Sequence, residues 1–227
     1  MIEAKSRAWW RATLALCLGS FLVFINLYAP QPLLPGLKET YQVSTLGVSL
    51  LMSVSTLSLA IALLVFGPLS DAIGREGIMR ITLLLAGGCS IALAFAPTFE
   101  SLLFLRLVQG FVLGGLPAVA IAWMGDEFEK PALLSAVGLY IGANSLGGIS
   151  GRIVGGGAAE IGGPMAAFLA VGIMTLIGCG VFWRLLPNSR AFTPQRFELR
   201  KAASDLVNHL RNPVLLAAYC LGGINFL

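Results

Sequence analysis

The chain has 227 residues, of which 57% are hydrophobic and 11% are charged, and its mean hydropathy is +0.85. This balance excludes an ordinary soluble globular domain and predicts an all-α integral membrane protein. The net charge of +4 does not indicate nucleic-acid binding, because the basic residues form no patch with interleaved aromatic residues. The four cysteines lie singly in apolar runs, so we expect no disulfide framework, no metal site and no cofactor.

Six apolar stretches are long enough to cross a membrane as helices, which takes about 20 residues for roughly 30 Å of hydrocarbon. They cover residues 13–34, 44–66, 78–96, 101–124, 132–156 and 165–186. Glycine recurs inside these stretches and favours close contact between helices. Residues 1–186 are therefore predicted to form a six-helix transmembrane bundle.

Basic residues indicate how the bundle is oriented, since loops rich in lysine and arginine stay in the cytoplasm. The loops expected on the outer side of the membrane contain one basic residue, Lys38. The opposite side carries Lys5, Arg7, Arg11, Arg75, Arg80, Lys130, Arg184, Arg190, Arg196, Arg200, Lys201 and Arg211. We expect a multi-pass protein of the inner (plasma) membrane with its amino terminus in the cytoplasm.

Residues 187–212 form the one long polar connection. Thr193 followed by Pro194 predicts a helix start, and the apolar residues from Leu199 to Leu210 recur at helical spacing. These features predict an amphipathic helix on the inner membrane surface, with a solvated charged linker as the alternative. A cytoplasmic interdomain loop is expected in either case.

A seventh apolar run covers residues 213–227. From Val214 it spans only about 21 Å as a helix, less than the roughly 30 Å that a membrane requires. We therefore expect the start of a seventh transmembrane helix and a missing carboxy-terminal half.

The turn between the second and third spans, residues 67–76, reads GPLSDAIGRE. Its glycines permit unusual backbone angles, and Asp71 and Arg75 place opposite charges near helix ends. The string resembles the signature loop of the major facilitator superfamily, G-x-L-[AS]-D-x-x-G-R-[RK], and lies where that family places it. Ala72 and Glu76 stand where the family usually has basic residues, and an ordinary polar turn is the alternative.

The resemblance implies a conformational latch at this turn. Asp71 would cap a helix of the second half, and Arg75 would pair with an acid at the cytoplasmic end of the fourth span. Such a latch would favour the outward-facing arrangement and break when the protein opens inward. The latch residues would be Gly67, Asp71, Gly74, Arg75, Asp126 and Glu127.

The fourth span contains residues 106–110, RLVQG, which resemble the family element R-x-x-Q-G. Arginine in a membrane costs at least a few kcal/mol, so Arg106 is expected to face the protein interior or a watery cavity. A side chain that snorkels to the outer surface is the alternative. Gly110 and Gly114 repeat every four residues and predict a stripe for helix packing.

The fifth span contains residues 138–152, GLYIGANSLGGISGR, similar to the element G-x-x-x-x-G-P-x-x-G-G of the family's drug and metabolite exporters. Gly148 replaces the usual proline and Arg152 the last glycine. Tyr140, Asn144 and Arg152 share a helix face that could line a cavity, although Asn144 could equally bond a neighbouring helix. The glycines expected to pack helices here are Gly142, Gly147, Gly148 and Gly151.

Tyr28 and Gln31 lie near a proline-induced kink in the first span, which borders the central cavity in the resembled family. The candidate substrate-binding residues are Tyr28, Gln31, Arg106, Gln109, Asn144 and Arg152. Two cavity arginines without nearby acids favour a neutral or anionic substrate. All acids lie in loops or at span ends, so a membrane-embedded proton carrier is expected in the missing half.

The resemblance implies two six-helix halves, each built of two inverted three-helix repeats, with the solute bound between them. We expect secondary active transport of a small solute by alternating access, as efflux coupled to protons. The expected partners are the solute, the lipid bilayer and the missing six-helix half. A non-transporting scaffold or sensor, an inactive fragment and a self-dimerising half-transporter are alternatives, whereas a lipid enzyme would need clustered acids or histidines.

Overall fold

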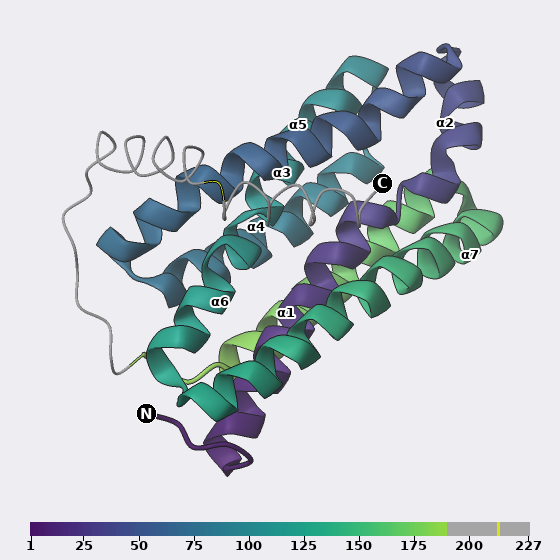
Figure 1. Ribbon diagram of the computed structural model, residues 1–227. Helices are drawn as coiled ribbons and strands as arrows, with labels where there is room; N and C mark the ends of the chain where they lie inside the picture. The colour runs from purple at the N-terminus through teal and green to yellow at the C-terminus, as the bar shows by residue number, and fades with distance from the viewer. Residues whose placement is uncertain (190–212, 214–227) are drawn as a thin grey trace.

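The computed structural model describes residues 1–189 and Pro213. Most of the predicted interdomain loop, with its amphipathic helix, and almost all of the predicted seventh apolar run lie outside these residues. The described part is helical, and its one β contact is an isolated bridge between Ile2 and Phe128. Figure 1 shows long helices packed side by side, which confirms the prediction of an all-α fold.

The first apolar rod is built of three helical pieces. Helix α1 covers Arg7–Tyr28 and is capped by Ser6, whose side chain accepts a hydrogen bond from the Trp9 amide. The 3-10 helix η1 (Gln31–Leu33) and helix α2 (Leu34–Tyr41) continue it, so residues 7–41 form one apolar rod. Prolines at the junctions lack an amide donor and interrupt the regular helix there.

Helix α3 covers Thr45–Ile73, and helix α4 covers Arg75–Ala94. A single residue separates them. Gly74 has a φ of 101°, which favours glycine, and it allows α4 to begin directly after α3 ends. This tight turn fixes the positions of the charged residues on either side of it.

Helix α5 (Phe99–Leu113) begins with a capping box between Thr98 and Ser101. It is followed, after Gly114, by helix α6 (Gly115–Glu127), and the two form one apolar rod from Phe99 to Glu127. The predicted fourth span lies within this rod.

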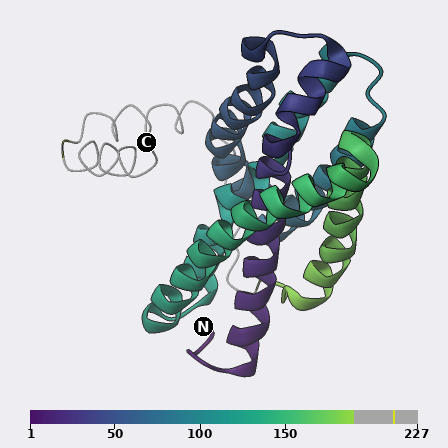
Figure 2. The ribbon, with the colours of Figure 1, turned by 90° about the vertical axis from the view of Figure 1, so that its right-hand side faces the viewer.

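Helix α7 (Lys130–Leu185) contains both the fifth and the sixth predicted spans. Its backbone leaves helical geometry at Gly162 and Gly163, directly before Pro164, and the chain turns back there into a second arm (Figures 1 and 2). No polar loop separates the two arms. The described residues therefore contain five helices apolar and long enough to cross a membrane, of which α7, with 56 residues, exceeds twice the roughly 20 needed for one crossing.

Glycines bring α1 and the first arm of α7 into backbone contact. A Cβ on Gly147 would lie 2.5 Å from the Phe21 carbonyl oxygen, and one on Gly151 would lie 2.7 Å from that of Ile25. Membrane helices have little hydrophobic force between them, so this close contact supplies much of their attraction.

The other predicted packing glycines differ in their surroundings. Gly110 lies against the backbone of Ser55 in α3, and a Cβ on Gly114 would lie 2.5 Å from the Ala62 Cβ. Gly148 lies against the Tyr28 ring. Gly142 departs from the expectation, because nothing in the described part of the chain lies within 4 Å of its Cβ position. It borders an open groove instead.

Many large apolar side chains point outward, including Leu46, Leu57, Phe104, Ile153 and Ile177. In water such a surface would favour aggregation, whereas in a bilayer it contacts acyl chains. The interior holds a separate set of apolar side chains, with Trp123, Phe128 and Phe182 among the largest.

The glycine contacts make a matched pair of variants informative. Gly151→Ala should lower the stability of the bundle by about 1–3 kcal/mol, because the added methyl meets backbone that cannot move aside. Gly142→Ala, in the same helix, should leave it unchanged or raise it slightly. Thermal unfolding of the purified protein in detergent would measure both, and equal effects would contradict the packing described here.

Candidate functional site

A buried arginine lies at the centre of the bundle. Arg106 on α5 is fully buried, and its guanidinium donates to the carbonyl oxygens of Asn26 and Leu27 on α1, at 3.3 Å each. It also donates to the carbonyl of Leu51 on α3 at 3.4 Å and to Gln109 Oε1 at 2.5 Å. The charge is thus surrounded by carbonyl dipoles, which stabilise it in place of water.

Gln109 extends this contact into a network of polar side chains. Its amide nitrogen donates to Ser90 Oγ on α4 at 2.6 Å and to Asn26 Oδ1 at 3.3 Å. Ser90 also donates to Asn26, and the Asn26 amide donates to Thr175 Oγ1 on α7 at 2.7 Å. One buried network therefore joins α1, α3, α4, α5 and α7.

The sequence pattern identified Arg106 and Gln109, which share a helix face and bond each other. It missed Asn26, Ser90 and Thr175 as their partners, because each lies in a different apolar run from Gln109. The outward-snorkelling alternative for Arg106 does not hold in this structure, since its side chain is fully buried. A contact between Arg106 and a solute stays a prediction.

Three other candidate residues meet on the face between α1 and the first arm of α7. The guanidinium of Arg152 lies 4.4 Å from the centre of the Tyr28 ring, in cation–π contact. Arg152 Nε donates to Gln31 Oε1 at 2.7 Å, and Nη1 donates to the Gly148 carbonyl at 3.1 Å. Arg152 and Gln31 are exposed and Tyr28 is partly exposed, so this cluster is accessible from outside the bundle.

Asn144 lies apart from that cluster. Its Oδ1 accepts a hydrogen bond from Ser20 Oγ on α1, which joins the two helices. The residue is partly exposed, so this bond does not bury it completely.

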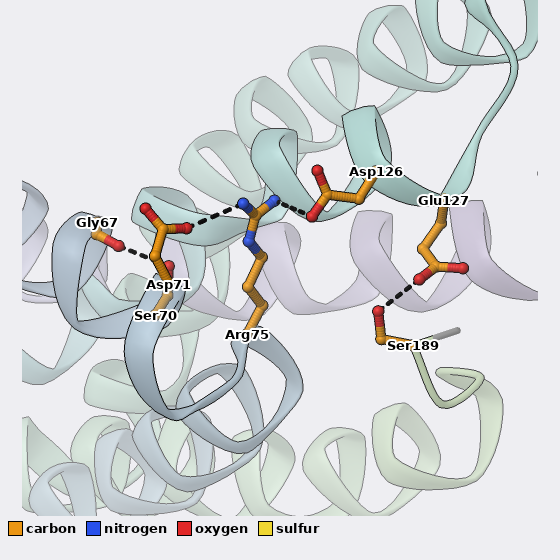
Figure 3. Close-up of polar contacts among 7 residues, drawn as sticks. All are labelled: Gly67, Ser70, Asp71, Arg75, Asp126, Glu127 and Ser189. Carbon is orange, nitrogen blue, oxygen red and sulfur yellow. Dashed lines mark hydrogen bonds and ion pairs between the residues drawn. The ribbon is translucent and has the colours of Figure 1, made fainter. Parts of the chain in front are cut away.

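The charged turn between α3 and α4 is shown in Figure 3. Arg75 binds two carboxylates, Asp71 at the end of α3 at 3.0 Å and Asp126 at the end of α6 at 2.7 Å. The turn is further braced by Ser70, whose hydroxyl donates to the Gly67 carbonyl at 2.6 Å. Gly74, with its positive φ, sets the direction in which α4 and Arg75 leave the turn. One guanidinium thus ties three helix ends together.

Glu127, the other predicted latch acid, has a different environment. It is buried, and it accepts a hydrogen bond from the Ser189 hydroxyl, after the end of α7 (Figure 3). The Ser189 amide donates to Glu76, which also lies 3.8 Å from Arg80. Arg80 in turn donates to the Leu186 carbonyl at 3.3 Å. Sequence reasoning noted Glu76 only as a departure from the family pattern and did not anticipate these contacts.

An open groove of about 490 Å³ lies between α1 and the first arm of α7. Its lining is apolar and includes Trp10, Cys17, Gly142 and Leu146, but none of the clustered polar candidates. Within the described ranges, no group of three or more histidine, cysteine or acidic residues is arranged to hold a metal ion.

Comparison with known proteins identifies the family. The Major Facilitator Superfamily profile matches residues 16–227, nearly the whole chain. The chain belongs to the major facilitator superfamily. It is accordingly a multi-pass membrane protein.

Two transport proteins are similar along almost the entire chain. The Bacillus subtilis (strain 168) MFS-type transporter YybF is 40% identical over 212 residues, covering 93% of this chain and 52% of the relative. The Escherichia coli (strain K12) inner membrane transport protein YnfM is 38% identical over 219 residues, covering 95% and 52%. The chain spans about half the length of these relatives.

A solved transporter structure shares the fold. It is the bacterial homologue of the human lysosomal transporter Spinster, in an inward-facing and unoccupied conformation. The TM-score is 0.78 with 16% sequence identity, and the match covers 92% of this chain and 49% of that one. At this identity the likeness concerns the fold alone.

The buried network predicts a clear effect on stability. Gln109→Leu should lower the free energy of unfolding by about 1–3 kcal/mol, because Arg106 and Ser90 would lose a partner inside the bundle. Ser49→Ala should change it little, since Ser49 is exposed and donates only to its own helix at Thr45. Denaturant titration of both variants in detergent would test this, and two similar losses would count against the network.

Proposed function

We propose that this chain is the amino-terminal half of a secondary transporter that moves a small solute across the inner (plasma) membrane by alternating access. Membership of the superfamily and the names of the similar transporters support this proposal. The missing partner would be a second six-helix half, and each half would consist of two inverted three-helix repeats. The bend that divides α7 into two arms supports a six-helix count for this half.

The geometry of Arg75 is the observation that carries the proposal. Alternating access requires contacts that hold one arrangement and can be broken in another. Arg75 binds Asp71 and Asp126 from two different helices, and all three residues lie at the same end of the bundle, partly accessible to water. Such a pair is weak enough to open during a transport cycle.

The direction of the chain in the membrane follows from its charges. We propose that the amino terminus and the Arg75 turn face the cytoplasm, because the basic residues concentrate at that end of the bundle. Efflux is supported by the likeness of residues 138–152 to the exporter element. Proton coupling would use an acid of the second half, since the acids of this chain lie in loops or near helix ends.

We propose that Tyr28, Gln31, Asn144 and Arg152 border the path of the solute. The exposure of this face supports that role. Arg106 and Gln109 would act on the path through the helices that their network holds, because both are buried in this arrangement.

The proposal is tested by solute flux. The whole protein that carries this chain should move at least one member of a panel of small acids, sugars and amines across proteoliposomes, and Arg106→Gln should lower that flux at least about ten-fold. The same loss is not expected for Arg11→Gln, which removes an exposed arginine at the cytoplasmic end of α1. Insertion and folding would be checked in parallel. A folded protein that moves no member of the panel would support a scaffold or sensor instead.

The latch makes a separate prediction. Asp126→Asn removes one of the two carboxylates that hold Arg75, and it should raise the inward-facing population about two- to five-fold, since a partly exposed ion pair contributes up to about 1 kcal/mol. Cys17 lines the open groove, so its rate of modification by a membrane-impermeant thiol reagent reports this change when the other cysteines are replaced by serine. Glu100→Gln, which removes a charge at the other end of the bundle, should leave the rate unchanged. An unaltered rate in Asp126→Asn would contradict the latch.

A further inference from the structure

Arg152 has an unusual set of partners for a charged group inside an apolar helix. Its recorded contacts are all with uncharged groups, namely the Tyr28 ring, the Gln31 side-chain oxygen and the Gly148 carbonyl. Helix α1 contains no acidic residue, and α7 contains only Glu160, about 12 Å further along the helix. Three ion pairs are recorded among the described residues, and none of them includes Arg152.

The surroundings hold the guanidinium in one orientation. The Tyr28 ring covers one of its faces, and Gln31 fixes Nε. Gly148 makes room for this arrangement, because a Cβ there would lie 3.2 Å from Tyr28 Cδ2 and 3.7 Å from Arg152 Nη1. Gly148 and Arg152, the two residues that depart from the exporter element, are therefore neighbours in the structure. A planar cation is held in place between two helices.

The held guanidinium keeps unused donors. An arginine side chain has five N–H groups, of which one on Nε and one on Nη1 are engaged by the contacts recorded in the described ranges. The other N–H of Nη1 and both of Nη2 remain. Neighbouring N–H groups of a guanidinium match the two oxygens of a carboxylate.

We propose that Arg152 is the recognition site for a small monocarboxylate, which supplies the negative charge that Arg152 does not receive from the described part of the chain. The inference rests on the proposed transport function, since it identifies the class of solute that the α1–α7 face would bind. Tyr28 and Gln31 act as positioning residues that hold the guanidinium.

The charge of the site favours a monoanion. One cation faces the solute here, and a doubly charged phosphate or a dicarboxylate would bring more negative charge than this cluster balances. A cationic solute would be repelled by Arg152, and a neutral one would offer no charge to pair with it. A single carboxylate satisfies both the charge and the planar donors.

Binding of three matched compounds tests the proposal. Benzoate, benzamide and benzylammonium share a ring and carry one negative, no and one positive charge. The whole protein, in nanodiscs of phosphatidylcholine, should bind benzoate most tightly of the three by calorimetry. Arg152→Gln should weaken benzoate binding by about ten- to a hundred-fold and leave benzamide binding nearly unchanged.

Two further variants separate recognition from folding. Arg152→Lys keeps the charge but loses the planar donors, so it should bind benzoate with an affinity between those of the wild type and Arg152→Gln. Arg11→Gln removes an exposed arginine at the far end of α1 and should bind benzoate as the wild type does. If Arg152→Gln does not fold, the benzoate affinity of Arg152→Lys is compared with that of the wild type instead. Equal benzoate affinity in those two proteins would then overturn the proposal.

Three other outcomes separate the carboxylate site from a structural role of Arg152 and from the transport function. Arg152 would be a structural partner of an acid elsewhere in the protein if Arg152→Gln lowered the melting temperature but left the preference for benzoate unchanged. Flux of an amine or sugar without any competition by benzoate would preserve the transport function and refute the carboxylate site. Arg152-dependent benzoate binding without flux of any solute would preserve the site and refute transport.

Discussion

A guanidinium group inside an apolar bundle is costly unless the protein supplies hydrogen-bond partners in place of water. For Arg106, backbone carbonyls from α1 and α3 and the Gln109 side chain accept hydrogen bonds from Nε, Nη1 and Nη2. The carbonyls belong to α1 and to α3, and α3 packs closely against α5. The position of the charge and the positions of the helices therefore depend on each other, and displacing either helix would leave a buried cation without compensation.

Close backbone contact makes this arrangement possible. Glycine allows α3 to approach α5 at Gly110, and Ser55 and Ser58 donate across the same seam to the carbonyls of Arg106 and Leu107, at 3.0 and 2.7 Å. Elsewhere in the bundle, Gly147 and Gly151 allow α7 to approach α1 closely. Small residues thus bring the polar groups of separate helices within hydrogen-bonding reach.

Much of this fold could be predicted from the sequence, because membrane helices are marked by the length and composition of apolar runs. The spacing of Arg106 and Gln109 also predicted correctly that both share one helix face. Partners on other helices could not be predicted in the same way. Asn26, Ser90 and Thr175 have no sequence relation to Gln109, and only the packing of the helices brings them together.

The contacts of the glycines could likewise be predicted only in part from the sequence. The four-residue spacing of residues 138–152 predicts a smooth face, but it does not say which part of that face has a neighbour. Gly147 and Gly151 lie against α1, whereas Gly142 borders the groove. Likewise, the sequence predicts two separate spans, 132–156 and 165–186, but not that two adjacent glycines let the chain bend between them within a nearly continuous helix.

The start of α4 and the end of α6 each carry two neighbouring acidic or basic residues that point to different partners. Arg75 and Asp126 bind each other, while Glu76 and Glu127 both receive hydrogen bonds from Ser189. Consecutive residues on a helix point about 100° apart, so one rigid displacement of α4 pulls on both sets of bonds. A displacement that loosens the turn after α3 would therefore also loosen the contacts of Ser189 at the exit of α7.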